Sequence, residues 1–399
     1  MASIEVADVF RQFGPSYLEA FGERMLPSHR RAIEDITACR TKAMGGHLYQ
    51  CGDCGEYFHV YHGCRNRSCP ACHTRQTEQW LEARKAELLP CPYYHVCVTV
   101  PAGLREGFRS NQSDCYGLFI KAAAESVIAL CRDKRYMGAT PAVLAVLHTW
   151  KGDIGYHPHV HLLVSGGGIA HDGVTWREAR HPFLVPVRAL SKVLRGKLRA
   201  WLKQARPDLE ANTPARVWNT QWVTWCHYSG QGQTAVLEYL ARYVHRIAIT
   251  NRRIVAMDER TVTLRYKVRK QSRWRTCTLE GHEFMRRFLQ HVLPKGFHKV
   301  RYYGLWNPKR RALLQNAQLT LQLAHDHPGQ SAPDQAAMDA RQPLTPEAFT
   351  EAPLTHDARP ICPHCKSANT YHMGLLKPQQ PMTRARASPR GEAHTKTTP

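Results

Sequence analysis

The sequence predicts an α+β fold, in which a small cysteine-rich domain precedes a sheet domain with flanking helices and a disordered tail follows. Three observations predict it. Cysteine, histidine, glycine and arginine replace hydrophobic periodicity between residues 39 and 73, which is typical of a metal-stabilised module. Strand and helix patterns then alternate along the chain. Finally, eleven of the 25 prolines fall in the last 75 residues. We therefore expect three regions, at 1–90, 91–305 and 325–399.

Hydrophobic periodicity gives the order of the elements. Residues 1–38 place apolar side chains at helical spacing, and Pro15 and Pro27 are expected to break this segment into two short helices. Residues 93–100 alternate and include β-branched side chains, which indicates a strand that Pro101 ends. The other expected elements are helices at 115–132, 186–205, 234–248 and 281–293, strands at 142–149, 160–164 and 216–226, and a hairpin at 253–269.

The chain is strongly basic. Its 399 residues carry a net charge of +23, and Lys and Arg are spread along the whole sequence. A polyanionic partner, nucleic acid above all, is the natural expectation. Membrane attachment would also use such charge, but the sequence contains no run of about 18 apolar residues and no signal-type start. We expect a cytoplasmic, nucleoid-associated protein.

Many of the 14 cysteines occur in pairs, without an export signal, which favours metal binding over a disulfide framework. Cys51-x2-Cys54 and Cys69-x2-Cys72 form two knuckles whose spacing lets four thiolates converge on one tetrahedral zinc. Such a zinc is structural, because four thiolates leave no open position. The alternative is a set of unpaired reduced cysteines. The residues that could complete a second zinc site nearby are Cys39, His47, His59, His62, Cys64 and His73.

Two arginines of this module, Arg65 and Arg67, are expected to present their charge to DNA phosphates or groove edges. A later pair, Cys362 and Cys365, falls in the expected disordered tail. A lone CxxC is a weak signal, and half of a zinc knuckle, redox chemistry and no role at all are comparable interpretations.

A histidine cluster follows the first strands of the sheet domain. The segment His157-Pro-His159-Val-His161 has the pattern of a strand, in which His159 and His161 share one face. Two imidazoles on one strand face can clamp a divalent ion. The alternative is a polar edge strand whose histidines are satisfied by hydrogen bonds. His157 shares the face, but Pro158 can bend the strand there.

Two tyrosines of the expected helix at 234–248, Tyr239 and Tyr243, are four residues apart and share a face, beside a second stripe of Arg242 and Arg246. Core tyrosines are the alternative, and the basic neighbours argue against it. A phenol with a pKa of about 10 needs such help to attack phosphorus. The histidines and tyrosines together indicate metal-assisted phosphoryl transfer that gives a 5′-phosphotyrosine.

Several long motifs carry a resemblance to a known family. They run from CRTKAMGGHLYQCGDCG and CRNRSCPACH through HTWKGDIGYHPHVHLLVSGGG and YLARYVHRIAITNRRI to HVLPKGFHKVRYYG. Over residues 30–305 the chain resembles the rolling-circle insertion-sequence transposases of the IS91 group, within the HUH endonuclease superfamily.

The resemblance implies an N-terminal zinc-binding domain and an HUH nuclease domain with a central antiparallel sheet. It implies His159 and His161 as ligands of magnesium or manganese, and Tyr239 and Tyr243 as nucleophiles. Arg242 and Arg246 would contact phosphate, and the third metal ligand stays open among His157, Glu238 and His245. The implied partners are single-stranded DNA at the ends of a mobile element and target DNA, and host replication proteins could take part.

Three rival functions remain. A plasmid rolling-circle replication initiator or a relaxase would use the same histidines and tyrosines, but the zinc module and the late LPKGFHKVRYYG motif favour a transposase. A non-catalytic zinc-dependent DNA-binding regulator would bind single strands without covalent attachment. A hydrolytic zinc enzyme is weakened by the absence of an HExxH-type acid. Candidates for base stacking, with core packing as the alternative, are Trp218, Trp222, Trp225, Trp274 and Trp306.

Overall fold

The computed structural model describes residues 4–72, 87–180, 183–231, 239, 248–267, 273–326 and 359–379. Tertiary contacts divide the chain into two units. The first unit comprises residues 1–37 and 65–350, and the second comprises residues 38–64 and 351–399. The second unit thus joins part of the cysteine-rich segment to the C-terminal region, which the sequence analysis assigns to separate domains.

A six-stranded antiparallel sheet forms the centre of the first unit, in the order β11-β4-β5-β3-β7, with β6 paired to β5. This arrangement, together with the flanking helices, confirms the predicted α+β fold. The strands are β3 (Pro92–Thr99), β4 (Ala139–Trp150), β5 (Tyr156–Ala170), β6 (Trp176–Glu178), β7 (Thr224–Gln231) and β11 (Val300–Gly304).

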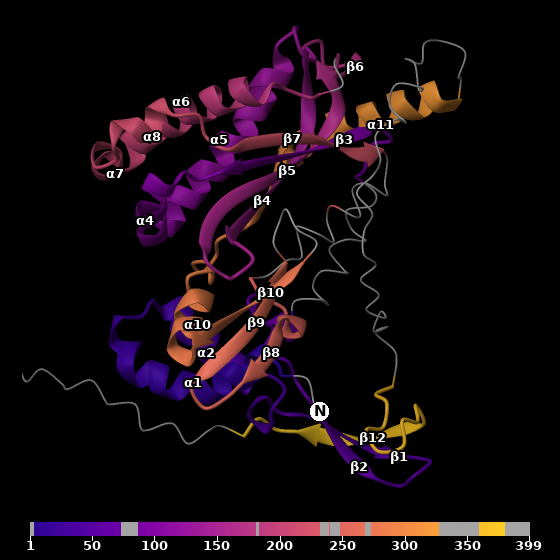
Figure 1. The fold of residues 1–399 in the computed structure, drawn as a ribbon. Helices are drawn as coiled ribbons and strands as arrows, with labels where there is room; N and C mark the ends of the chain where they lie inside the picture. The colour runs from indigo at the N-terminus through magenta and orange to yellow at the C-terminus, as the bar shows by residue number, and fades with distance from the viewer. Residues whose placement is uncertain are drawn as a thin grey trace, which may run out of the picture. The chain divides into compact units, whose positions relative to one another are not determined.

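One face of this sheet is covered by helices. Val143, Ala145 and Leu147 of β4 and Val160 and Leu162 of β5 pack against α5 and α6, because alternate residues of a strand point to the same face. Figure 1 shows α5 and α6 lying along this face. The helices on this side are α4 (Ala102–Ser110), α5 (Gln112–Arg132), α6 (Val187–Ala205), α7 (Pro207–Ala211) and α8 (Ala215–Asn219).

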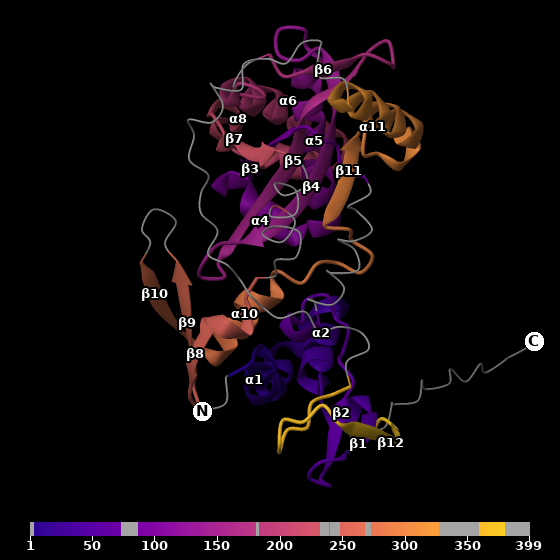
Figure 2. The same cartoon turned by 90° about the vertical axis from the view of Figure 1, so that its right-hand side faces the viewer.

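The opposite face carries a smaller core and the histidines. Leu144 and Val146 of β4 and Leu163 of β5 cluster with Leu314 and Ala317 of α11 (Arg311–Asp326). Figure 2 shows α11 across the sheet from α5 and α6. The two core clusters therefore divide the sheet into a fully covered face and a face that keeps room for polar side chains.

The predicted strand at 216–226 is wrong in its first half. Pro214 precedes the short helix α8, and proline is well suited to a helix start. Strand β7 begins only at Thr224. Trp218 and Trp222 are both buried, with 5.7 Å between their ring centroids.

The N-terminal helices pack against the later part of the same unit. The helix α1 (Val6–Phe21) continues through Pro15 instead of breaking there, whereas Pro27 begins α2 (Pro27–Ala38). The ring of Phe10 packs edge-on against Phe288 of α10 (Gly281–Leu289), with 4.9 Å between centroids. A second antiparallel sheet has the order β10-β9-β8, formed by β8 (Ile254–Met257), β9 (Thr261–Lys267) and β10 (Trp274–Glu280).

The second unit is built on a three-stranded antiparallel sheet in the order β12-β1-β2. Its strands are β1 (Gly46–Cys51), β2 (Tyr57–Tyr61) and β12 (Thr370–Leu376). In Figure 1 the yellow strand β12 lies beside the indigo strand β1. In the part of the chain that the structure describes, the short 3-10 turns are η1 (Gly22–Arg24), η2 (Lys42–Met44), η4 (Asn251–Arg253) and η5 (Pro308–Arg310). Among the described residues, no helix has the length and apolar character needed to span a bilayer.

Candidate active site

Three buried histidines meet on the polar part of the central sheet. His159 and His161 lie on β5, and His148 lies directly opposite His159 on the neighbouring strand β4. Their ligand nitrogens all lie within 4.8 Å of one another, and the three residues are 2 to 7% exposed. Such a set of converging imidazoles can hold a divalent ion.

Hydrogen bonds orient two of these rings. Nδ1 of His159 lies 2.7 Å from the carbonyl oxygen of His157, which can only accept, so Nδ1 carries the proton. Nδ1 of His161 lies 2.8 Å from Nε2 of His95 on β3. In both histidines the contact engages Nδ1 and leaves Nε2 available to a metal ion. Hydrogen bonds to the second ring nitrogen commonly hold metal-ligating histidines in orientation.

The structure adds a third histidine, His148, to the two that the strand pattern predicts. His148 stacks on Trp150 at 4.5 Å and meets His161 edge-on at 4.7 Å. His157, a candidate for the third ligand, contributes its backbone carbonyl and is not part of the three-histidine group. The other two candidates, Glu238 and His245, lie outside the described residues.

Tyr239 lies on the same side of the sheet as the histidines. Its ring meets His95 edge-on, with 5.3 Å between centroids and 74° between planes, and its side chain is 2% exposed. Since His95 also contacts His161, one imidazole separates the tyrosine from the three-histidine group. Tyr243, Arg242 and Arg246 lie outside the described residues.

A tryptophan borders this group. Trp225 of β7 packs edge-on against His95 at 5.0 Å and remains 44% exposed. Among the base-stacking candidates Trp274 is also exposed, whereas Trp218, Trp222 and Trp306 are buried. Among these five tryptophans, and within the described residues, Trp225 is the one that is exposed and also contacts His95.

The cysteines are grouped differently from the expected set of four. Cys51 and Cys54 converge with Cys362 and Cys365, not with Cys69 and Cys72. A second group with sulfur atoms within 4.8 Å of one another consists of Cys39, Cys64, Cys69 and Cys72. The spacing of two CxxC pairs indicates metal binding, but it does not say which pairs share an ion. His47, expected near a second zinc, instead contacts His372, with 3.0 Å between Nδ1 and Nε2.

The two arginines expected to bind DNA have different surroundings. Arg65 is exposed and adopts a left-handed backbone conformation, with φ of 55°. Arg67 instead donates to the backbone carbonyls of Leu293, Pro294 and Phe297, and burial lowers the pKa of its guanidinium. Arg67 is therefore engaged in holding the chain around residues 293–297, which differs from the expected surface role.

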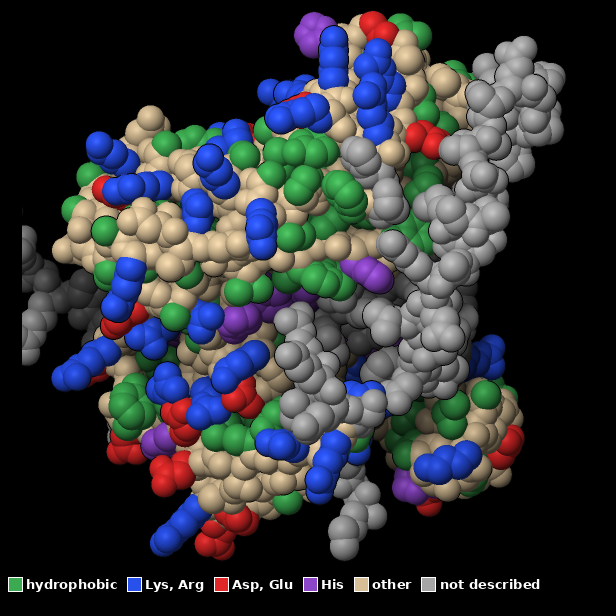
Figure 3. Space-filling view, turned by 45° about the horizontal axis from the view of Figure 1, so that its top comes forward, with side chains coloured by type: hydrophobic (Ala, Val, Ile, Leu, Met, Phe, Trp, Pro, Cys, Tyr) green, Lys and Arg blue, Asp and Glu red, His purple; other side chains and the backbone are tan. Residues whose placement is uncertain are grey.

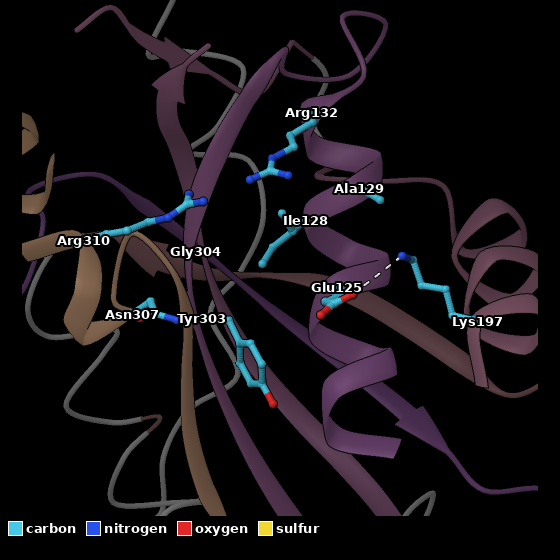
Figure 4. A pocket seen from close by; sticks show the side chains of 9 residues that line it. All are labelled: Glu125, Ile128, Ala129, Arg132, Lys197, Tyr303, Gly304, Asn307 and Arg310. Carbon is cyan, nitrogen blue, oxygen red and sulfur yellow. Dashed lines mark ion pairs between the residues drawn. The ribbon is translucent and has the colours of Figure 1, made fainter. Parts of the chain in front are cut away.

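A hollow of about 370 Å³ lies apart from the histidines, between α5 and β11. Figure 4 shows the side chains of Arg132 and Arg310 extending toward each other, while Glu125 pairs with Lys197 at 3.8 Å. Figure 3 shows Lys and Arg side chains distributed over the visible face rather than confined to a single patch. The basic side chains that line the hollow are thus part of a wider distribution of positive charge. Its lining includes no histidine that could bind a metal ion.

Comparisons with known proteins identify the family to which this sequence is similar. A family described as "Transposase zinc-binding domain", of IS91 type, matches residues 9–100, and one described as "Putative transposase" matches residues 142–312. "Putative transposase y4qJ" of Sinorhizobium fredii is 36% identical over 376 residues, which cover 90% of this chain and 94% of that protein. The transposase for insertion sequence element IS801 of Pseudomonas savastanoi pv. phaseolicola is 26% identical over 288 residues, covering 68% of this chain and 69% of the relative. No solved structure matches the chain. The chain therefore belongs to the family of IS91-type transposases.

Proposed function

We propose that this transposase nicks and rejoins single-stranded DNA through a 5′-phosphotyrosine, and so drives rolling-circle transposition of its element. The observation that carries the proposal is the three-histidine group with Tyr239 one imidazole away. A metal-binding group near a phenol would supply both the Lewis acid and the nucleophile of a metal-assisted phosphoryl transfer.

The proposed exchange conserves the number of phosphoester bonds. The phenol oxygen of Tyr239 bonds to phosphorus, the bond from phosphorus to the 3′ oxygen breaks, and the 3′ end leaves as a hydroxyl after taking up a proton. A 3′-hydroxyl from another end then attacks the phosphotyrosine and restores the DNA bond, while the phenol regains a proton. Tyr243 would provide a second nucleophile. No nucleotide cofactor is needed, because the covalent intermediate retains the energy of the original bond.

The donor atoms indicate which ions suit the site. A divalent ion would polarise a phosphate oxygen and offset the charge that develops on it. His148, His159 and His161 would hold it through ring nitrogens. Imidazole favours transition-metal ions more than it favours Mg²⁺, which prefers oxygen donors. We therefore expect Mn²⁺ to support cleavage at lower concentrations than Mg²⁺.

Two further residues have roles in this proposal. His95 would hold His161 in its metal-binding orientation through the contact of 2.8 Å. Trp225, being exposed at the border of the histidine group, would stack on a base and position the strand. Because Tyr239 is buried, we expect strand binding to rearrange its surroundings.

The test is incubation of the purified protein with labelled single-stranded oligonucleotides from the ends of its element, with Mn²⁺ or Mg²⁺, followed by a denaturing gel. We expect a metal-dependent labelled band at the mass of the protein. Tyr239→Phe combined with Tyr243→Phe should abolish the band without weakening DNA binding, since only the nucleophilic hydroxyls are removed. Tyr136→Phe, outside the site, serves as the matched control.

Metal binding is measured separately, by calorimetric titration with Mn²⁺. His148→Ala and His161→Ala should each lower the affinity on the order of 100-fold and abolish the adduct, whereas the exposed His171→Ala should change neither. DNA binding without any adduct, for both ends and both metals, would instead favour a zinc-dependent DNA-binding regulator.

A further inference from the structure

We propose that Cys51, Cys54, Cys362 and Cys365 bind one structural zinc ion, so that residues 360–376 form the second half of a zinc ribbon that begins at β1. The second cysteine pair lies beyond both regions that the transposase families match, which end at residues 100 and 312. The proposal does not depend on the strand-transfer mechanism.

The sulfur atoms have the spacing of zinc ligands. Sγ of Cys51 lies 3.4 Å from Sγ of Cys365, and Sγ of Cys54 lies 3.7 Å from Sγ of Cys362. A tetrahedral ion with Zn–S bonds of about 2.3 Å places its sulfur ligands roughly 3.8 Å apart. The four thiolates would fill the coordination sphere, so this ion would be structural and not catalytic.

The two halves have the same backbone geometry. In each, the first cysteine donates its N–H to the carbonyl five residues later, at 2.9 Å for Cys51 and 2.8 Å for Cys362. Its own carbonyl accepts from the N–H four residues later, that of Gly55 at 2.9 Å and that of Lys366 at 3.0 Å. Both of these donors are in the left-handed region, with φ of 75° and 65°. Lysine adopts this conformation at a cost, which a metal-bound turn can offset.

Contacts besides the sulfurs hold the halves together. The carboxylate of Asp53, between the first two cysteines, accepts hydrogen bonds from the Ser367 hydroxyl and from the Asn369 amide, the latter at 2.7 Å. The N–H of Gly52 donates to the carbonyl of Asn369, also at 2.7 Å. Strand β12 pairs with β1 from the zinc end to Gly46, which lies opposite Leu376. The two knuckles are thus parts of one folded module.

The interior of this module is too small to fold without a metal. Its described core consists of Cys51, Phe58 and Cys362, with Tyr49 and Val60 partly buried beside it. Three buried side chains cannot offset the conformational entropy of ordering the surrounding segments. Zinc binding commonly supplies this free energy in small cysteine modules.

The first test counts zinc ions per chain in the full-length protein by elemental analysis. The double variant Cys362→Ser, Cys365→Ser should contain one zinc ion fewer than the wild type, and so should Cys51→Ser, Cys54→Ser. Combining all four substitutions should cause no further loss, because both pairs serve one ion. The control Cys226→Ser, Cys277→Ser removes two cysteines outside the groups and should leave the zinc content unchanged.

The second test uses the wild-type protein, so it does not depend on how the variants fold. Cys54 and Cys365 are exposed, and without zinc they should react readily with iodoacetamide. We expect both to be protected until a chelator is added, and then to become alkylated together. Unchanged zinc content in the Cys362, Cys365 variant, alkylation of Cys365 while the equally exposed Cys54 stays protected, or disulfides between the two pairs would each overturn the proposal.

Discussion

His291 is a buried histidine that is satisfied in its neutral form. Its Nε2 donates to the carbonyl of Ile154 at 2.8 Å, and Nδ1 lies 3.0 Å from the hydroxyl of Thr149. Burial lowers the pKa of His291 to about 4. Since the carbonyl takes the only ring proton of the neutral form, the hydroxyl donates the second hydrogen bond, to Nδ1.

This environment predicts acid sensitivity. Between pH 6.5, the usual histidine pKa, and pH 4, unfolded His291 binds a proton that the folded protein excludes. The free energy of unfolding should therefore fall across this range as the pH is lowered, by roughly 3 kcal/mol for this residue, and level off below it. Urea unfolding of the wild type and of His291→Gln measures the difference. The prediction is contradicted if the two proteins lose stability equally; His171→Gln is the exposed control.

At the scale of single residues, the sequence was sufficient to predict two of the three clustered histidines, His159 and His161. His159 and His161 share a face because strand alternation is local, and the structure agrees. His148 and His95 come from neighbouring strands, whose register no local pattern specifies. Only the pairing of β3, β4 and β5 places the side chains of His148 and His95 beside His159 and His161.

At the scale of elements, strand β5 depends on a glycine. A Cβ added to Gly168 would lie 2.3 Å from the carbonyl oxygen of Thr140 and 2.9 Å from the nitrogen of Pro141, both backbone atoms of β4. Gly168 is therefore part of a close pairing between β4 and β5.

We expect Gly168→Ala to lower the free energy of unfolding by about 1–3 kcal/mol, because the strands must separate to admit the methyl group. The matched control is Gly196→Ala in α6, where an added Cβ meets nothing within 4 Å. This control should be stabilising by about 0.5–1 kcal/mol, since alanine is the better helix former. Chemical denaturation of both variants checks the pair, and equal effects would refute the close-approach argument.

Among the elements, periodicity located most helices and strands but not their partners. The helix α5 and the strands β3 and β4 lie close to their predicted bounds, whereas β5 (Tyr156–Ala170) extends beyond the predicted strand at 160–164 on both sides. Strand β12 was missed, because proline-rich composition averaged over 75 residues conceals a short ordered segment. Such a segment can be ordered by metal ligands and strand pairing rather than by large apolar residues, so composition carries little signal for it.

At the scale of the whole molecule, the net charge of +23 predicts a strong dependence of DNA binding on salt. If six phosphates are neutralised, the affinity for single-stranded DNA should fall by roughly 300-fold between about 50 and 200 mM salt. Fluorescence anisotropy titrations measure this slope. Titrated without divalent metal, the variant His161→Ala should show the same slope, because it removes no Lys or Arg, whereas a flat salt response would contradict binding by distributed charge.

The pairing of β1 with β12 also affects how the protein is made. Cys54 and Cys362 are separated by 308 residues, so at about 5–20 residues per second the ribosome needs on the order of tens of seconds to add the second knuckle after the first. During translation β1 and the first cysteine pair are synthesised long before β12. Only a chain extended through residue 376 can form the complete ribbon. A prematurely terminated chain would leave β1 with one edge unpaired, a feature that cellular quality control could recognise.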